Sequence, residues 1–459
     1  MYKIVQNNLF LVFCVAFGGL GYAQNIENTF PLKWKAKVGQ TTYRSNIIFA
    51  NGKIWLGSNG NSLSQTPDDL DAVFGIEPQN GKITDKITPI QLPENADSDI
   101  NGIAIEGSKL YFGTDAKTLY AYDLTQKSFL WTYKAPKDSL DDSNYNNFES
   151  CPLLVDLNND EEKDIVANLR GKGTVAINGK TGNPLWLNVS SNAEGAYLTS
   201  PVCIDVNSDA TPDIITGGWD FEYTPYLYAL NGKNGEILWQ YNLGSGLKSS
   251  PVLVKKGKKT AIMVATTYSV VHLIDLTGSL LYYVDFQMPN EAPAFGGISG
   301  LYASPALSPN ETLLIGSAWW SDANDGVWLA HLNKAKIQDN NGKKEVDRSV
   351  RKFYTANRVT ASAVVGQFTS KNWQFAVPTE RGELLIYDEK TQALQRYKMP
   401  SGSECTPLVA DIDGDKKLEL LIASYDGYLY CYQLPRKKAK IFTGQFRQNN
   451  LNQALIQLK

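Results

Sequence analysis

Three short segments of the chain carry carboxylate and amide side chains at the same alternating spacing. Each fits the pattern D-x-[DN]-x-D-x-x-x-[DE]. Oxygens at positions 1, 3, 5 and 9, with the position-7 carbonyl, can converge on one point and suit Ca²⁺, which takes about six to eight oxygen ligands. The residues that fit are Asp156, Asn158, Asp160 and Asp164; Asp205, Asn207, Asp209 and Asp213; and Asp411, Asp413, Asp415 and Glu419. Acidic surface turns without metal would contain the same residues, but three copies favour calcium.

A second group of residues combines aromatic rings with charges in the connections between expected strands. Flat aromatic faces beside carboxylates and guanidinium groups suit sugars or peptides, and convergent polar groups are typical of ligand sites. The expected ligand-binding residues are Arg170, Trp219, Asp220, Tyr223, Lys248, Tyr268, Tyr302, Trp319, Trp320, Asp322, Glu380, Arg381 and Tyr425. The alternative for any single Trp or Tyr is packing between neighbouring sheets.

No catalytic set can be assigned from the residue types. The chain has two histidines, His272 and His331, each within a hydrophobic strand pattern, and we expect both to pack between sheets. The sequence shows no Ser-His-Asp set, zinc motif or phosphate loop. A lyase or hydrolase that uses Tyr, Lys or paired carboxylates stays open. In a lyase, Lys248 or Tyr302 would abstract a proton and an arginine would neutralise a uronate.

A repeat of about 50 residues positions these side chains. Eight hydrophobic strands align at positions 47, 102, 152, 201, 251, 305, 363 and 407. At five of these positions the residue is the proline of a Ser-Pro, Cys-Pro or Thr-Pro pair. Self-similarity at this period in strand-rich units indicates a β-propeller, whose four-stranded blades have this length. The sequence therefore predicts an all-β fold, an eight-bladed β-propeller of four-stranded antiparallel blades.

Each unit is expected to contain strands A to D, as at 213–217 (B), 226–230 (C) and 237–241 (D). In such a blade the D–A and B–C connections lie on one face, and the A–B and C–D turns on the other. The acidic turns therefore mark one face and the aromatic residues mark the opposite face. That second face also receives Arg44, Asp99, Asp115, Glu149, Tyr197, Glu222, Arg358, Glu404 and Asp426. Two insertions, 58–71 in a B–C connection and 339–347, are rich in polar residues, and we expect the first to be an exposed loop.

The N-terminal part should close the ring. Residues 32–36, around Trp34, resemble the D strand around Trp239 but have no blade of their own. We expect them to complete the eighth blade, because an open propeller would expose sheet edges. Residues 439–459 would then form a strand or tail packed on the outside.

Two family resemblances follow from these motifs. The A-x-N-x-x-x-G-x-x-x-W pattern at Ala229, Asn231, Gly235 and Trp239 resembles the tryptophan-docking repeat of quinoprotein-type (PQQ-like) propellers, in which the Trp packs between blades. The acidic turns resemble those of FG-GAP-type propellers, although that family has Gly at positions 4 and 6 and only Gly414 is present here. The adjacent cysteines of quinoprotein dehydrogenases are missing, so we expect no PQQ.

The composition of the chain and its N-terminal segment limit the possible partners and the cellular location. The chain has 459 residues, 43% of them hydrophobic, and a net charge of −3, which gives no support to a nucleic-acid or anionic-membrane partner. Residues 1–23 read as a secretory signal peptide, which leaves 24–459 as a single propeller domain that is secreted or periplasmic and has no transmembrane segment. Buried free thiols are favoured for Cys151, Cys203, Cys405 and Cys431, with a Cys151–Cys203 disulfide as the alternative.

Taken together, these features predict an exported, non-catalytic propeller. It would bind a carbohydrate or a protein on the face of its B–C and D–A connections, and calcium would brace the opposite face. The alternative is a calcium-containing polysaccharide lyase or another glycan-degrading propeller enzyme.

Overall fold

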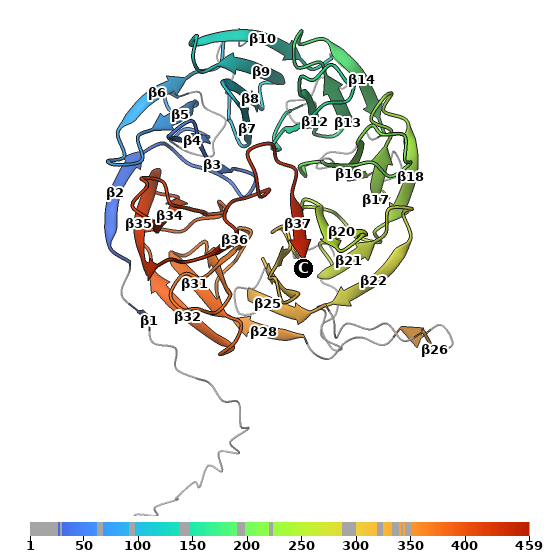
Figure 1. The fold of residues 1–459 in the computed structure, drawn as a ribbon. Coiled ribbons are helices and arrows are strands. Elements are labelled where there is room, and N and C mark those ends of the chain that lie inside the picture. Colours follow the sequence, from blue (N-terminus) through green and yellow to red (C-terminus); the bar gives the residue numbers. More distant parts are fainter. Residues whose placement is uncertain are drawn as a thin grey trace, which may run out of the picture.

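Eight antiparallel blades of four strands each surround a central channel in the computed structural model, which confirms the predicted fold (Figure 1). The structure describes residues 26–27, 30–61, 68–90, 97–136, 147–190, 198–219, 224–286, 300–318, 325–332, 339–340, 343–344 and 350–458. The predicted signal peptide lies outside these residues. None of the described residues forms a helix long and apolar enough to cross a membrane.

Each blade runs from an innermost strand A to an outermost strand D. Blades 1 to 4 consist of β3 (Ile47–Ala50), β4 (Lys53–Gly57), β5 (Val73–Ile76) and β6 (Ile83–Ile87); β7 (Ile103–Glu106), β8 (Lys109–Gly113), β9 (Thr118–Asp123) and β10 (Ser128–Lys134); β11 (Leu153–Val155), β12 (Asp164–Leu169), β13 (Gly173–Ile177) and β14 (Pro184–Val189); and β15 (Val202–Ile204), β16 (Asp213–Trp219), β17 (Pro225–Leu230) and β18 (Ile237–Asn242). Blades 5 to 8 consist of β19 (Val252–Lys256), β20 (Lys259–Ala265), β21 (Val270–Ile274) and β22 (Leu280–Asp285); β23 (Ala306–Leu307), β24 (Thr312–Gly316), β25 (Gly326–His331) and β28 (Arg351–Tyr354); β29 (Val364–Gly366), β30 (Gln374–Pro378), β31 (Glu383–Asp388) and β32 (Ala393–Lys398); and β33 (Leu408–Ala410), β34 (Lys417–Ala423), β35 (Tyr428–Lys437) and β2 (Leu32–Lys37).

The ring closes as predicted. β2 pairs antiparallel with β35, so that Trp34 lies opposite Cys431 as the D strand of blade 8. The Trp34 indole N–H donates to the Pro78 carbonyl of blade 1 at 2.7 Å. The first blade is therefore joined to the last by a side chain as well as by the chain itself.

Docked tryptophans join four of the seams between blades. Trp34, Trp131, Trp186 and Trp239 each lie on a glycine of the next blade, at Gly81, Gly182, Gly235 and Gly278 respectively. A Cβ on Gly235 would come within 2.6 Å of the Trp186 ring, and the residue has a φ of +74°, so glycine is required there. The structure thus confirms the scaffold role that the PQQ-like repeat implied for these tryptophans.

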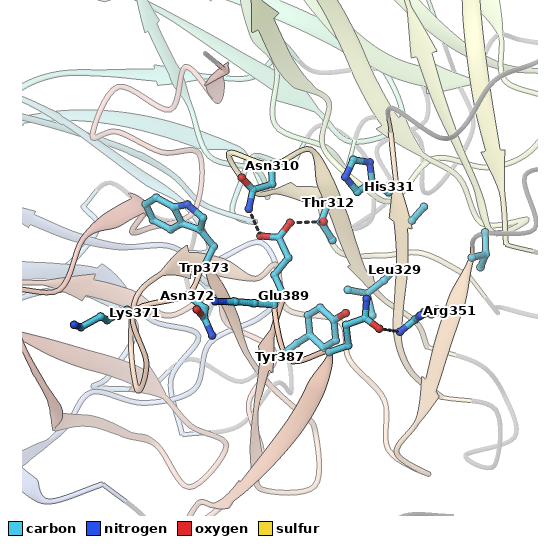
Figure 2. A pocket seen from close by; sticks show the side chains of 14 residues that line it. Asn310, Thr312, Leu329, His331, Arg351, Lys371, Asn372, Trp373, Tyr387 and Glu389 are labelled. Carbon is cyan, nitrogen blue, oxygen red and sulfur yellow. Dashed lines mark hydrogen bonds between the residues drawn. The ribbon is translucent and has the colours of Figure 1, made fainter. Parts of the chain in front are cut away.

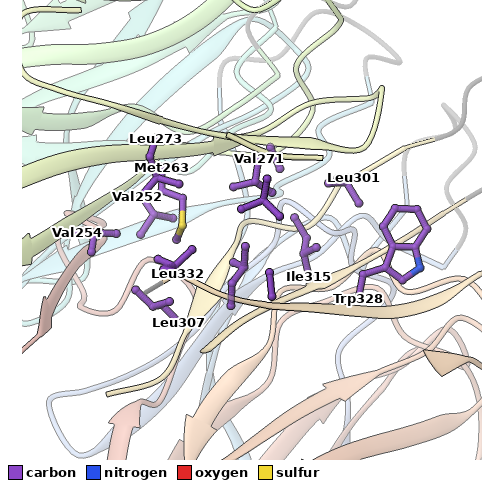
Figure 3. Close-up of a cluster of buried hydrophobic side chains, with 14 of the residues drawn as sticks. Val252, Val254, Met263, Val271, Leu273, Leu301, Leu307, Ile315, Trp328 and Leu332 are labelled. Carbon is purple, nitrogen blue, oxygen red and sulfur yellow. The ribbon is translucent and has the colours of Figure 1, made fainter. Parts of the chain in front are cut away.

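Apolar side chains fill the space between neighbouring blades. Between blades 5 and 6, for example, Met263, Leu273, Leu307 and Trp328 are buried in one cluster (Figure 3). Both sheet faces are covered in this way, so the A, B and C strands read as nearly continuous hydrophobic segments.

The C-terminal segment departs from expectation, because it lies in the central channel rather than on the outside. β36 (Ile441–Thr443) pairs with β29 of blade 7, and β37 (Leu455–Leu458) pairs with β19 of blade 5, both on the channel side (Figure 1). Innermost strands have free backbone N–H and C=O groups that need partners when buried. The tail supplies them.

Hydrogen bonds from the tail reach several other blades. The N–H groups of Ile105 and Leu154 donate to the Asn450 and Leu451 carbonyls at 3.0 and 3.1 Å. The Asn452 side chain donates to the Ile103 and Pro152 carbonyls at 2.9 and 2.7 Å. The tail therefore links inner strands that lie far apart in the sequence.

Arg447 places a buried positive charge in this tail. It is 4% exposed, and its guanidinium donates to the carbonyls of Pro251 (2.9 Å) and Pro201. Burial lowers the pKa of Arg447 to about 10. Backbone carbonyl dipoles are the partners of this cation, and they fix the tail against blades 4 and 5.

The remaining described elements are small. β1 (Ile26–Glu27) adds to the outer edge of blade 7 in parallel with β32, and β26 (Asp339–Asn340) and β27 (Lys343–Lys344) form a hairpin in the charged insertion of blade 6. The four cysteines among the described residues are free thiols, as favoured, and no disulfide joins Cys151 to Cys203. Of the 58–71 insertion, which was expected to be an exposed loop, the structure describes 58–61 and 68–71. Asn61 and Asp69 there are exposed, whereas Ser58, Asn59, Gly60 and Asp71 are buried.

Candidate functional site

The B–C and D–A connections share one face of the ring, as expected. Backbone N–H groups of B–C turns donate to D–A carbonyls of the same face: Asp115 to Asp99 at 3.3 Å, Glu380 to Arg358 at 3.0 Å, and Tyr425 to Gly402 at 2.8 Å. We call this face, around the opening of the channel, the mouth face. Its side chains are held at the ends of rigid strands, which suits a binding site.

Two tyrosines meet at the centre of the mouth face. The rings of Tyr43, which precedes blade 1, and Tyr302, which precedes blade 6, are 5.7 Å apart in an edge-to-face arrangement. Blades 1 and 6 are not neighbours, so this contact spans the channel opening. The Lys248 Nζ lies 5.5 Å from the Tyr302 ring, and the Arg44 guanidinium lies 5.2 Å from the Tyr43 ring.

A buried carboxylate ties two arginines together beside these tyrosines. Glu149 accepts from Arg44 at 2.5 Å and from Arg170 at 2.8 Å, one on each oxygen. Burial opposes ionisation of Glu149, but the two guanidinium groups outweigh it and lower the pKa of Glu149. Burial, together with the positive charges of Arg44 and Arg170, lowers the pKa of Lys248.

The blade 7–8 side of the mouth face carries carboxyl groups. Burial, and then the charge of Glu380, raise the pKa of Glu404 to about 7. Burial and these two carboxylates also raise the pKa of Tyr425. Thr360 donates to Glu380 at 3.1 Å. The mouth face therefore has a basic part near blades 1, 3 and 5 and an acidic part near blades 7 and 8.

Five predicted ligand-binding residues come together here: Arg170, Lys248, Tyr302, Glu380 and Tyr425. Tyr268, 53% exposed, and Arg381 lie further out on the same face. Trp219 ends β16, and Asp220, Tyr223, Trp319, Trp320 and Asp322 lie outside the described residues. Tyr43 was not predicted, although its position directly before Arg44 in a D–A connection was a usable indication.

The acidic turns lie on the opposite face and share one geometry. In the second turn, Asp205 accepts the N–H groups of Ser208 at 2.7 Å and Ala210 at 3.0 Å. Positions 4 and 6 have positive φ, 64° at Ser208 and 69° at Ala210, where the related family has glycine. Asp213 at position 9 is fully buried and accepts the N–H groups of Val206 and Gly232. The position-9 carboxylate thus joins the A–B turn to the C–D turn.

The fit of a cation differs among the three turns. In the third turn, oxygens of Asp411, Asp413 and Glu419 lie within 4.8 Å of one another. The Lys33 ammonium already contacts two of them, at 2.5 Å from Asp413 and 3.1 Å from Glu419. A lysine therefore supplies the positive charge there. In the second turn the Lys233 ammonium lies 3.0 Å from Oδ2 of Asp209. In the first turn Asn158 and Asp160 are exposed and Asp156 is partly exposed, and these residues could hold Ca²⁺ together with the buried Asp164.

A groove of about 760 Å³ separates blades 6 and 7 on the face of the acidic turns (Figure 2). The D strand of blade 6 reads Arg-Lys-Phe-Tyr, and no tryptophan stands there to dock across the seam. Glu389 lies in the groove and accepts from Asn310 at 2.9 Å and from Thr312. The groove was not predicted, and it lies at one of the seams that have no docked tryptophan.

Comparison with known proteins supports the repeat assignment. Residues 95–249, which include blades 2 to 4, match a family model described as "Outer membrane protein assembly factor BamB". The predicted resemblance to PQQ-like propellers is confirmed. No curated protein compared with the chain matches it.

Several solved structures share the fold. A europium-containing methanol dehydrogenase is 13% identical, with a TM-score of 0.61 over 88% of this chain and 93% of its own. BamB from Moraxella catarrhalis is 13% identical, with a TM-score of 0.54 over 88% and 100%. Quinohemoprotein alcohol dehydrogenase ADHIIG from Pseudomonas putida HK5 is 13% identical, with a TM-score of 0.57 over 89% and 76%. At this identity the likeness is one of fold.

Proposed function

We propose that this chain is an exported, non-catalytic propeller that binds a protein partner on its mouth face. The observation that carries the proposal is the channel filled by the chain's own tail. Asn46, two residues after Arg44, donates its Nδ2 to Oδ1 of Asn452 in the tail at 3.3 Å. The tail therefore closes the channel beneath the side chains of the mouth face, and these side chains form a surface suited to a macromolecule.

The chemistry of that surface supports a protein ligand. Basic and acidic groups lie in different parts of the face around the two central tyrosines, and such patterns give specificity and orientation to protein interfaces. Tyr and Arg are also enriched where interfaces gain most binding energy. The BamB-type family match points the same way, since its description names an assembly factor. A carbohydrate that stacks on Tyr268 is the alternative ligand.

A polysaccharide lyase is the alternative function, and one residue favours it. Burial and neighbouring arginines lower the pKa of Lys248, as a catalytic base would need. Tyr302 does not fit that role, because burial and Tyr43 raise its pKa to about 12. Calcium in the first two acidic turns would brace the opposite face in either function.

One set of assays distinguishes a protein-binding propeller from a polysaccharide lyase. Wild-type protein and the double variant Tyr268→Ala/Arg381→Glu are compared for quantitative recovery of co-purifying proteins from cell envelopes, with Lys258→Glu on the opposite face as the matched control. The proposal expects one partner to be lost from the double variant and kept by the control. Unsaturated products from an acidic polysaccharide that disappear in Lys248→Ala would support the lyase instead. Glycan-array binding without products and without a protein partner would support a carbohydrate ligand.

A further inference from the structure

A cluster of carboxylates lies between blades 1 and 2 on the mouth face, apart from the acidic turns. Oxygens of Asp71, Asp97 and Asp99 lie within 4.8 Å of one another. Asp71 ends the B–C insertion of blade 1 and is 3% exposed, whereas the other two come from the connection to blade 2. Asp115, in the B–C turn of blade 2, contacts the same connection through its backbone N–H.

One oxygen of each of three carboxylates lacks a hydrogen-bond donor, although the other oxygens of Asp97 and Asp99 accept from Ser98 N–H and Asn59 Nδ2. Oδ2 of Asp97, Oδ1 of Asp99 and Oδ1 of Asp115 are buried and have no hydrogen-bond partner. Burying an ionised carboxylate without a partner costs several kcal/mol, so natural sites pair it or place a cation beside it. A cation beside these carboxylates would offset that cost for their ionised forms.

A neutral side chain at the same place gives independent evidence for a ligand. Asn59 is 3% exposed, and its Nδ2 donates to Oδ2 of Asp99 and to Oδ1 of Asn101, each at 3.2 Å. Its Oδ1 is buried and has no hydrogen-bond partner. An amide oxygen buried without a donor is a costly feature in an interior and a common ligand in calcium sites.

The electrostatics agree with this geometry. Burial and the charges of Asp115, Asp97, Asp71 and Glu149 raise the pKa of Asp99 to about 8. Burial and nearby carboxylates also raise the pKa of Asp115 to about 7. Four carboxylates therefore raise the pKa of Asp99, and a cation would relieve these interactions together.

We propose that Asp71, Asp97 and Asp99, with Asn59 and Asp115 beside them, form a binding site for a divalent cation of the calcium class. Carboxylate and amide oxygens are hard ligands, and loops that supply several of them without a rigid octahedron suit Ca²⁺ better than Mg²⁺. The ion would fasten the B–C insertion of blade 1 to blade 2. The site is separate from the acidic turns and does not depend on the proposed function.

The test uses full-length protein in which Asp160→Asn and Asp209→Asn weaken the first two acidic turns. Calcium binding is measured by calorimetry, and terbium luminescence gives a second readout. Asp71→Asn/Asp99→Asn is expected to weaken binding at least tenfold. Asp69→Asn is the matched control, since Asp69 lies in the same insertion with its side chain 83% exposed, and it should bind as the parent does.

A melting curve in metal-free buffer guards against simple misfolding. Asp71→Asn/Asp99→Asn removes repulsion, so it should melt at least as high as its parent without metal and gain less when calcium is added. Calcium affinity that is equal in the parent and the double variant would overturn the proposal, and so would a parent that binds no calcium.

Discussion

Replacement of Trp186 by alanine should destabilise the seam between blades 3 and 4. The indole is 7% exposed, lies on Gly235 and donates to the Gly232 carbonyl at 2.8 Å. Removal of a buried Trp side chain costs about 3–5 kcal/mol, and loss of the donor to a buried carbonyl adds about 1 kcal/mol. We therefore expect a loss of about 4–6 kcal/mol in the free energy of unfolding.

The measurement is urea unfolding followed by far-UV circular dichroism, with hydrogen exchange to locate the weakened blades. Trp186→Phe keeps most of the contact with Gly235 but loses the N–H donor, and it should cost about 1–3 kcal/mol. Trp373→Ala is the comparison, because Trp373 is only partly buried beside the groove between blades 6 and 7, and it should cost less than Trp186→Ala. A cost for Trp186→Ala below about 1 kcal/mol, or equal to that of Trp373→Ala, would refute the docking argument.

Three further predictions concern the tail, the carboxylates and the turns. Deletion of residues 441–459 should lower the melting temperature strongly, because inner-strand N–H groups such as that of Leu154 lose their acceptors; an unchanged melting temperature would contradict the role of the tail. In metal-free buffer, ionisation of Asp99 should reduce stability as pH rises from about 4 towards 8, because its folded pKa is raised from 3.8 to about 8, and Asp99→Asn should flatten that decline in melting curves. Chelation of calcium should lower the melting temperature less in Asp156→Asn/Asp205→Asn than in wild type. Identical shifts of the melting temperature in the two proteins would contradict calcium binding in these turns.

The blades could be predicted because their information is local and repeated. Pro-flanked A strands at 152, 201 and 251 give the blade spacing, and the likeness of Trp34 to Trp239 identified the strand that closes the ring. The tail could not be placed in this way, because its partners are channel edges that exist only after the ring has formed. Burial alternates along Leu455–Leu458 in the structure, but the sequence of this segment does not alternate between apolar and polar residues.

The functional face could be predicted in part. The blade topology assigned Arg170, Lys248 and Tyr302 to one face, and the structure brings them together there. The contact between Tyr43 and Tyr302 depends on the diameter of the channel, which the repeat length does not give. The acidic turns were found because their spacing lies within one turn, whereas Asp71 and Asp99 come from different connections and share no motif.

The central claim, that the mouth face binds a protein partner, is tested most directly by site-specific photo-crosslinking in intact cells. A photoreactive residue replaces Tyr268 on the mouth face or Lys258 in the A–B turn of blade 5 on the opposite face; both positions are exposed. The account predicts one discrete protein adduct from position 268, which Arg381→Glu weakens, and no such adduct from position 258. Adducts from position 258 alone, or none from either position, would contradict it.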